Sequence, residues 1–369
     1  MTIRSVKIGI IGCGRVSGHH CRSILETEGV ELLAVCDLVA EKAAAYQEQY
    51  GAKAYVNYHE MLSENPTIEA VAVITPSGMH FEHVLDIVTH YQRHIIVEKP
   101  TFMKPSQVKV AYAKAAEAGV RLFPVFQNRH NLAVRRVLRG IASGELGRVR
   151  LASVRVRWCR PQRYYDLAPW RGTFSMDGGC LTNQGIHHID LLRFLAGNVT
   201  RVSSMHTTLG ADIEVEDTAT ATIAFENGAV GSLEVTTAAR PIDYEASISL
   251  VCENGLAQIG GIAVNELQIY TPDPAACGKH SEDFSGNVYG FGHAQIYRDI
   301  AAYFHQGLPY PITAEDALGT IQLLNAFYVA DERRVWVDVA GAGDSERLGR
   351  PDEELANLYR TPAFFPSRT

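Results

Sequence analysis

The sequence has 369 residues, of which 46% are hydrophobic and 20% charged, and its formal net charge is −7. This is the composition of an ordinary globular protein, and the length favours about two domains. The acidic balance argues against a nucleic-acid partner, which needs a basic surface, and no apolar run approaches the roughly 18 residues that span a membrane.

Seven cysteines are scattered along the chain without a C-x-x-C pair. The odd number and the spacing indicate neither a disulfide framework nor a zinc site, so we expect reduced thiols in a cytoplasmic protein and no bound metal. The apolar run at residues 8–11 is short and is followed by a glycine, so we do not expect a signal peptide.

The chain opens with an apolar run at residues 7–11, a Gly-x-Gly turn and an amphipathic segment at 20–28. A strand, a glycine turn and a helix in this order bind the pyrophosphate of a dinucleotide at the helix N-terminus. The first glycine allows the tight turn, and the second lets the backbone approach the pyrophosphate. The candidate cofactor contacts in this turn are Gly12, Gly14, Arg15 and Val16.

A second predicted strand at 31–36 ends in Asp37. The spacing from the glycines is about that expected for the acidic residue that binds the ribose hydroxyls. A carboxylate there disfavours a 2′-phosphate, so we expect NAD rather than NADP. Asp37 has an alternative role as the N-terminal cap of a helix expected at 41–50.

Strands and helices continue to alternate as far as Gln127. Apolar runs predict strands at 52–55, 70–74, 95–97 and 121–126. Periodic segments predict helices at 58–63, 80–89 and 106–118. The short connections between them indicate a parallel, doubly wound sheet. We therefore expect a dinucleotide-binding Rossmann domain over residues 1–127.

The strand at 95–97 ends abruptly in Glu98, Lys99 and Pro100. Ligands bind beyond the carboxyl ends of parallel strands, so a lysine here points into a crevice. Burial or a nearby positive charge would lower its pKa and make it a proton donor or acceptor near neutral pH. The Lys99–Pro100 bond is a candidate cis peptide. Judged on this stretch alone, Lys99 could equally be a surface lysine after a buried strand.

The pattern changes after a helix expected at 132–143. Alternating residues predict strands at 149–158, 199–208, 218–225, 229–236, 246–252 and 256–259. Asn-Gly pairs at 227–228 and 254–255 predict hairpins, and consecutive hairpins build an antiparallel sheet. This half is therefore expected to be an α+β domain over residues 128–340.

Two late segments, 293–305 and 314–330, predict helices. The second is preceded by Thr313 with Asp316 three residues on, a variant of the capping box. Residues 341–369 are polar and rich in glycine and proline, and we expect a C-terminal tail that packs on a neighbouring subunit.

A second group of reactive side chains lies within residues 177–190. Asn183, His187 and Asp190 fall on one helix face, and a histidine there can act as general base near neutral pH. A zinc site at His187 and Asp190 lacks a third ligand at any recognisable spacing. At least one of the two adjacent histidines has a packing role, and we favour His188 for it.

These residues resemble the glucose-fructose oxidoreductase / inositol dehydrogenase / rhizopine catabolism family of NAD(P)-dependent sugar oxidoreductases. The likeness covers nearly all of the chain to about residue 340. It is carried by the glycine turn and by the Glu-Lys-Pro element. Two further motifs support it: the first comprises Thr75, Pro76 and His80, and the second comprises Gly185, His187 and Asp190.

The resemblance implies a Rossmann domain followed by a large open, mixed or mostly antiparallel sheet, which commonly mediates dimer or tetramer assembly in the family. It implies Lys99 and His187 as the catalytic pair, in roles that could be exchanged. It adds to the cofactor set Thr75, Pro76, His80 and Glu98. Inositol dehydrogenases have an aspartate where this chain has Asn183, so we expect Asn183 to hydrogen-bond substrate or His187 in the catalytic site without taking a proton.

A narrower similarity lies in an arginine- and aromatic-rich stretch at residues 157–172. It is similar to the branch that oxidises nucleotide-activated N-acetylated sugar acids at C3, as UDP-N-acetylglucosaminuronate 3-dehydrogenases do. Arginines bind diphosphates and carboxylates, and aromatic rings stack on a base or a sugar. The same arginines are equally compatible with the solvent-exposed face of a strand. The candidate substrate contacts are Arg129, Arg157, Arg160, Tyr164, Trp170, Arg171, Gln184 and His188.

We therefore expect a homo-oligomeric, NAD-dependent dehydrogenase that oxidises a secondary hydroxyl of a sugar, at C3 of a nucleotide-activated sugar acid. Three alternatives stay open: a dehydrogenase of a free sugar or a cyclitol such as myo-inositol, a redox-neutral glycosidase that uses tightly held NAD, and a non-enzymatic NAD(P)-binding regulator. The retention of Lys99 and His187 disfavours the regulator.

Overall fold

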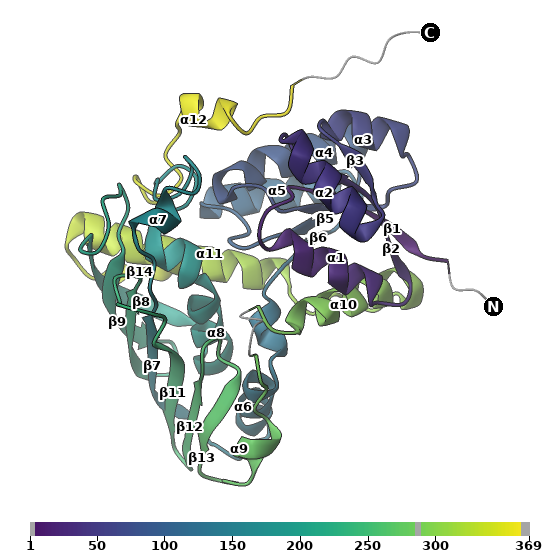
Figure 1. Ribbon diagram of the computed structural model, residues 1–369. Coiled ribbons are helices and arrows are strands. Elements are labelled where there is room, and N and C mark those ends of the chain that lie inside the picture. The colour runs from purple at the N-terminus through teal and green to yellow at the C-terminus, as the bar shows by residue number, and fades with distance from the viewer. Residues whose placement is uncertain (1–3, 285–288, 363–369) are drawn as a thin grey trace, which may run out of the picture.

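The structure, a computed structural model, describes residues 4–284 and 289–362, and a six-stranded parallel sheet forms its first part (Figure 1). The strands are β1 (Val6–Ile11), β2 (Val30–Cys36), β3 (Lys53–Tyr55), β4 (Ala70–Val73), β5 (His94–Val97) and β6 (Leu122–Pro124). Their order is β3-β2-β1-β4-β5-β6. The order reverses between β1 and β4, which opens a crevice beyond the carboxyl ends of these strands.

Helices cover this sheet and connect its strands, as the sequence predicted. They are α1 (Ser17–Leu25), α2 (Ala40–Tyr50), α3 (Tyr58–Glu64), α4 (His80–Tyr91) and α5 (Pro105–Glu117). All four residues of β4 are fully buried, because a parallel sheet covered on both faces needs a continuous apolar strand. The expected doubly wound α/β domain is confirmed.

An eight-stranded sheet forms the second part. Its strands are β7 (Val149–Arg157), β8 (Val199–Thr207), β9 (Thr218–Phe225), β10 (Val230–Thr236), β11 (Glu245–Cys252), β12 (Leu256–Gly260), β13 (Glu266–Tyr270) and β14 (Val337–Asp338), in the order β13-β12-β11-β7-β10-β9-β8-β14. The two Asn-Gly hairpins are confirmed, because β9 pairs antiparallel with β10 and β11 with β12. β7 runs parallel to β10, so the sheet is mixed but mostly antiparallel.

The sequence did not predict β13 or β14. β14 has only two residues, too few for an alternating pattern. In β13, Leu267 and Ile269 alternate with polar residues, but the buried Tyr270 follows Ile269 directly. The strand therefore has one apolar side chain more than strict alternation allows.

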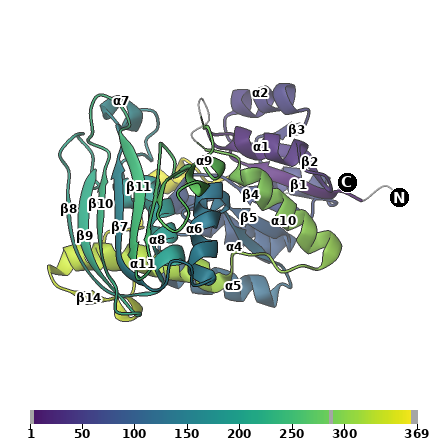
Figure 2. The ribbon, with the colours of Figure 1, turned by 90° about the horizontal axis from the view of Figure 1, so that it is seen from below.

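The larger helices of the second part are α6 (Leu132–Ala142), α8 (Ile186–Ala196), α10 (Gly292–Gln306) and α11 (Ala314–Arg333), with short helices α7 (Gln162–Tyr165), α9 (Ala276–Lys279) and α12 (Glu353–Asn357). Figure 2 shows α6 and α8 between the large sheet and the Rossmann domain. α11 packs on both β8 and α5, and α10 packs on α1. The predicted capping box is present, because the hydroxyl of Thr313 accepts a hydrogen bond from Asp316 N at 3.1 Å and the carboxylate of Asp316 accepts one from Thr313 N at 3.0 Å.

The large sheet buries one face and exposes the other. Along β7 the side chains of Ala152, Val154 and Val156 are buried, whereas Leu151 is 39% exposed. Cross-strand pairing places Leu151 in one row with Val230 and Val251. Successive side chains of a strand point to opposite faces, so this exposed row lies on the face away from the buried residues that pack toward α8. We call it the open face of the sheet.

The described part of the expected tail packs on its own chain, and its packing on a neighbouring subunit stays a prediction. Leu348 and Ala356 are buried, and Gly349 N donates to Phe174 O at 2.8 Å. The boundaries expected at residues 127 and 340 stay predictions.

No helix among the described residues is long and apolar enough to cross a bilayer. The seven cysteines are all free thiols, five of them buried.

Stability should depend on α11, because this helix packs on both parts of the molecule. Leu324 on α11 is fully buried, so Leu324→Ala should lower the free energy of unfolding by about 3 kcal/mol. Urea denaturation followed by circular dichroism measures this. Leu308→Ala is the control, since Leu308 is 50% exposed and its truncation should cost less than about 1 kcal/mol. Equal losses in the two variants would contradict the packing argument.

Candidate active site

A cavity of about 640 Å³ lies beyond the carboxyl ends of the parallel strands. Three stretches far apart in the sequence supply most of its lining, and Tyr289 adds to them. The Rossmann domain contributes Gly12, Asp37, Thr75 and Lys99, among others. The segment from α7 to α8 contributes Tyr164, Asn183 and His187, and the C-terminal segment contributes Leu358, Tyr359 and Thr361. Both predicted groups of reactive residues therefore meet at one cavity.

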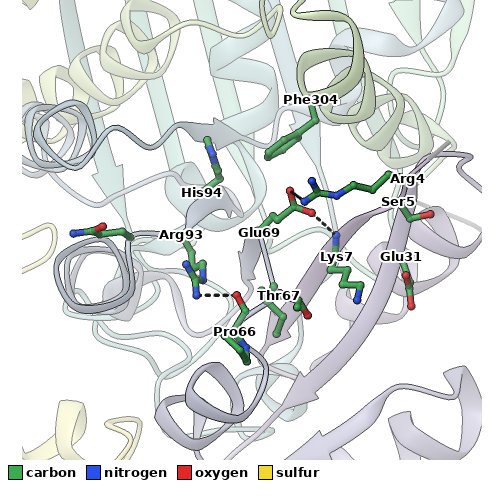
Figure 3. A pocket seen from close by; sticks show the side chains of 12 residues that line it. Arg4, Ser5, Lys7, Glu31, Pro66, Thr67, Glu69, Arg93, His94 and Phe304 are labelled. Atoms are coloured by element: carbon green, nitrogen blue, oxygen red, sulfur yellow. Dashed lines mark hydrogen bonds and ion pairs between the residues drawn. The ribbon is translucent and has the colours of Figure 1, made fainter.

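A second pocket, of about 630 Å³, lies at the opposite edge of the same sheet (Figure 3). It is lined by residues near the starts of β1, β4 and β5, where Arg4 pairs with Glu69 at 2.7 Å. None of the predicted site residues lines this pocket. We therefore place the reaction in the first cavity.

The glycine turn has the shape that a dinucleotide needs. Gly12 has φ +97°, and a Cβ there would lie 2.5 Å from Ile74 O, so only glycine fits. A Cβ on Gly14 would meet nothing within 4 Å, so the space in front of this backbone is free for a pyrophosphate. Ser17 Oγ donates to Gly12 O at 2.5 Å and accepts from Gly14 N at 3.2 Å, which fixes the turn. The residues present fit NAD.

Asp37 stands at the end of β2 and lines the cavity. Its carboxylate accepts hydrogen bonds from Cys13 N at 2.8 Å and from Val39 N at 2.9 Å. The residue in the capping position of α2 is Val39, so the alternative role of Asp37 as that cap is not observed. The carboxylate is held next to the glycine turn, where the ribose of a bound dinucleotide lies.

The remaining predicted cofactor residues also line the cavity: Arg15, Val16, Thr75, Pro76, His80 and Glu98. The ring of His80 lies 2.9 Å from Pro100 O and 3.0 Å from Thr75 O. It therefore joins the loop after β4 to the loop after β5, the two loops that flank the crevice.

Lys99 crosses from the Rossmann domain to the second domain. Its Nζ donates to Asn183 O at 2.9 Å, and the Lys99–Pro100 peptide bond is cis. Burial lowers the pKa of Lys99 below its ordinary value, against the opposing effect of the carboxylates of Glu98 and Asp177. The amine is thus a proton donor or acceptor closer to neutral pH than an ordinary lysine.

His187 lies in the first turn of α8, just after a π-helical turn at Cys180–Gln184. Its Nε2 is 3.2 Å from the side-chain nitrogen of Gln127, and its buried Nδ1 has no hydrogen-bond partner among the described residues. Burial, and next the charge of Lys99, hold the pKa of His187 well below the ordinary 6.5. The ring is therefore neutral at neutral pH and able to accept a proton.

Asn183 holds Lys99 through its backbone carbonyl. Its side-chain amide donates to the carboxylate of Asp177, and the structure shows no bond from it to His187. Asp177 is almost fully buried and also accepts from Gly172 N at 2.8 Å. Neither Asp177 nor Gln127 was predicted as a site residue from the sequence, although each stands at the edge of a motif that was recognised there.

One group of described residues has the spacing of metal ligands: His20, Glu98 and His293. His20 Nε2 lies 2.9 Å from the carboxylate of Glu98, and its Nδ1 lies 2.8 Å from the hydroxyl of Tyr297. Two ligands of a tetrahedral zinc ion are about 3.3 Å apart, so 2.9 Å is better explained by a direct hydrogen bond. Burial alone would raise the pKa of Glu98, but the hydrogen bond from His20 and the ring of His293, 3.5 Å away, outweigh it and hold that pKa well below its ordinary value.

A cationic and aromatic wall faces the reactive residues. Tyr164, Trp170 and Arg171 line the cavity. The guanidinium of Arg171 lies 4.4 Å from the ring of Tyr164 and 4.6 Å from that of Trp170, and it donates to the hydroxyl of Tyr164 at 2.6 Å. Stacking holds the planar donor group of Arg171 over the faces of the two rings.

Five predicted substrate contacts are not among the described residues that line the cavity: Arg129, Arg157, Arg160, Gln184 and His188. Arg157 pairs with Glu234 at 2.6 Å on the open face of the sheet, and Arg160 pairs with Asp243 at 2.7 Å. Gln184 donates to the hydroxyl of Tyr164 at 3.3 Å and so touches the wall from behind. His188 is fully buried, which agrees with the packing role favoured for it.

Arg129 is engaged by Asp190, the last residue of the motif in α8. The two side chains form a buried pair with contacts of 2.6 and 2.7 Å, and Asp316 lies 3.2 Å from the same guanidinium. Asp190 thus ties α8 to the turn after β6, which carries Gln127.

Comparison with known proteins agrees with this arrangement. Residues 6–126 match the oxidoreductase family with an NAD-binding Rossmann fold, and residues 134–258 match the GFO/IDH/MocA C-terminal domain. The chain belongs to the GFO/IDH/MocA oxidoreductase family. The expected family, enzyme class and NAD cofactor are confirmed.

Several relatives act on sugars or polyols. The WlbA dehydrogenase from Bordetella pertussis, solved with NADH and UDP-GlcNAcA, is 33% identical; the match covers 92% of this chain and 99% of that one with a TM-score of 0.85. The myo-inositol 2-dehydrogenase of Thermotoga maritima is 24% identical over 62% of this chain and 68% of its own. The D-glucoside 3-dehydrogenase of Escherichia coli is 27% identical over 63% of this chain and 71% of its own. The chain is therefore a member of a family of NAD-dependent sugar and polyol dehydrogenases.

Asp37 should determine the choice between NAD and NADP. Asp37→Ser removes the charge that repels a 2′-phosphate, so kcat/KM for NADP relative to NAD should rise about tenfold or more. Steady-state kinetics with both cofactors measure this. Glu41→Ser is the control, because Glu41 is exposed on α2 and does not line the cavity. An unchanged ratio in Asp37→Ser would exclude the ribose contact.

The pH dependence of sugar oxidation should report His187. Its lowered pKa keeps the ring neutral down to pH values below 6.5, so the acid limb of the activity profile should lie below pH 6.5. Lys99→Met removes a positive charge that lowers this pKa, so the acid limb should move to higher pH while kcat falls about 10²-fold or more. Lys109→Met, at an exposed lysine of α5, should change neither. A variant with full turnover would rule out the role of Lys99.

Proposed function

We propose that the protein oxidises a secondary hydroxyl of a nucleotide-activated sugar acid, at C3 of a UDP-N-acetylglucosaminuronate-like substrate. The observation that carries this proposal is the likeness to the WlbA dehydrogenase, which extends over 99% of that protein and so includes the second domain, where the substrate wall lies. That dehydrogenase was solved with UDP-GlcNAcA.

The chemistry of the wall supports this substrate. Arg171 offers a guanidinium clamped between two aromatic rings, and a guanidinium fork binds a carboxylate or a diphosphate through two parallel hydrogen bonds. Tyr164 and Trp170 offer faces on which a sugar or a base can stack. A neutral free sugar would offer the guanidinium of Arg171 no anionic group to bind.

His187 and Lys99 have different roles at the substrate hydroxyl that is oxidised. Bound NAD⁺ supplies the hydride acceptor. The neutral ring of His187 takes the hydroxyl proton, and the amine of Lys99 holds the same oxygen and stabilises its developing negative charge. Asn183 O fixes the Lys99 amine from one side, and the amide of Gln127 fixes the ring of His187. This geometry exists before substrate binds, so little reorganisation is needed at the reacting oxygen.

We also propose that copies of the chain assemble through the open face of the large sheet. Its row of Leu151, Val230 and Val251 is 39%, 55% and 39% exposed, and an uncovered apolar row on a sheet marks a contact surface. A dimer or tetramer would bury it. The free thiols favour the reducing cytoplasm as the compartment.

Absorbance of NADH with a substrate panel tests the proposed reaction. NADH should form with UDP-N-acetylglucosaminuronate and not with free sugars or myo-inositol. Arg171→Gln should lower kcat/KM for the sugar acid about 10²-fold, whereas Arg163→Gln, at an exposed position of α7, should stay within about twofold.

Other outcomes would overturn the substrate. NADH formed from a free sugar or a cyclitol would keep the family and reject the nucleotide sugar. No NADH from any of them, with NAD(H) released on denaturation, would favour a tightly held cofactor and redox-neutral chemistry.

A further inference from the structure

The dinucleotide cavity has a wall that comes from the far end of the chain. Leu358, Tyr359 and Thr361 line it together with the glycine turn and the end of β2. In Figure 1 the short helix α12, in yellow, lies above α7, and the yellow segment after it leads toward the Rossmann helices. We call residues 352–362 the C-terminal strap.

The strap is held to both domains at its first half. Asp352 caps α12 by accepting from Leu355 N at 2.9 Å. Ala356 is then buried in a small cluster with Met79, from the loop before α4, and Met176, from the second domain. This cluster is separate from the main core, so it can open without disturbing the rest of the molecule.

Its second half is held to the Rossmann domain by polar contacts. Arg360 donates to both carboxylate oxygens of Glu82 on α4 at 2.8 and 3.0 Å. Asn57, the N-cap residue of α3, donates to Pro362 O at 2.9 Å. Arg360 also pairs with Glu353 of the strap itself at 2.6 Å. These pairs are at least one-third exposed, and exposed pairs of this kind are weak enough to break and re-form readily.

The apolar residues in the cavity indicate what the strap covers. Leu358 is 58% exposed although it lines the cavity, and Leu38 and Val39, just after Asp37, are 39% and 42% exposed there as well. Exposed aliphatic side chains on both sides of a cavity are favourable contacts for a flat, partly apolar ring. A purine ring of the dinucleotide supplies such a surface next to the ribose at Asp37.

We propose that the C-terminal strap closes over the bound dinucleotide and controls its exchange, with Leu358 as a cofactor contact. NAD(H) leaves only after the cluster around Ala356 and the Arg360–Glu82 pair have opened. The strap therefore slows cofactor release without taking part in hydride transfer. This inference depends on the NAD binding of the family and not on the sugar, so it stands or falls independently of the proposed substrate.

The rate of NADH release tests the strap. Protein loaded with NADH is mixed with excess NAD⁺ in a stopped-flow instrument, and the loss of NADH fluorescence gives the dissociation rate without any sugar. A chain that ends at Pro351 should release NADH about tenfold faster or more. Glu82→Gln, which breaks the bond between the strap and α4, should raise the rate about threefold.

Arg360 provides a matched control, because it has one carboxylate partner across the interface and one within the strap. Glu353→Gln removes only the inner partner and should leave the release rate within about twofold. Leu358→Ser should release NADH faster and so bind it more weakly, with no change in the melting temperature of the protein without cofactor, as expected of a contact that is made only when cofactor is present.

The results that overturn the inference are equally distinct. If Glu82→Gln and Leu358→Ser both release NADH at the wild-type rate, the strap does not cover the cofactor, and this holds even if the shortened chain fails to fold. If Glu353→Gln accelerates release as much as Glu82→Gln does, the link to α4 is not what retains the cofactor.

Discussion

Lys99 lies where the two domains meet, and its hydrogen bond to Asn183 O depends on both of them. The strand β5 delivers the lysine to the crevice, and the π-helical turn at Cys180–Gln184 turns a backbone carbonyl toward it. Partial burial in the cavity makes this contact important, since an amine withdrawn from water needs a partner and its pKa falls. Lys99 also helps to keep His187 neutral. The position of one amine therefore couples domain packing to the protonation states on which oxidation of an alcohol depends.

The sequence predicted most of what is local. The glycine turn, the Glu-Lys-Pro element and the histidine pair are contiguous motifs, and in each the chemistry follows from neighbouring residues, so Gly14, Lys99 and His187 were placed at the site from the sequence. Which face of a strand meets the helices is decided by packing across the sheet. Arg157 therefore could not be assigned from its alternation alone, and it lies on the open face beside Glu234. Asp177 and Gln127 could not be predicted as site residues either, because their roles depend on contacts with side chains from other segments.

Asp190 illustrates how a motif residue can act through the scaffold. Its place on the same helix face as His187 suggested a role in the reaction. Its carboxylate instead forms an ion pair with Arg129, and both side chains are almost fully buried. Breaking such a pair leaves an uncompensated charge and costs about 3–5 kcal/mol. The pair fixes α8 relative to the turn that carries Gln127, and Gln127 in turn contacts His187. The aspartate thus orients the proposed base from a distance, and its substitution would reduce turnover without any contact to substrate.

The chain end adds a third wall to a cavity that the two domains already form. The consequence is kinetic, because a dehydrogenase that exchanges NAD with solvent must open the cavity in each turnover, whereas one that regenerates NAD in place need not. The strap is fixed by a small apolar cluster and by exposed ion pairs, with the deep core left intact when it opens. Weak anchoring of this kind suits repeated opening, since a strap buried in the main core would hold the cofactor for many turnovers. Under the proposal that the strap controls cofactor release, this anchoring favours an enzyme that exchanges its cofactor between turnovers.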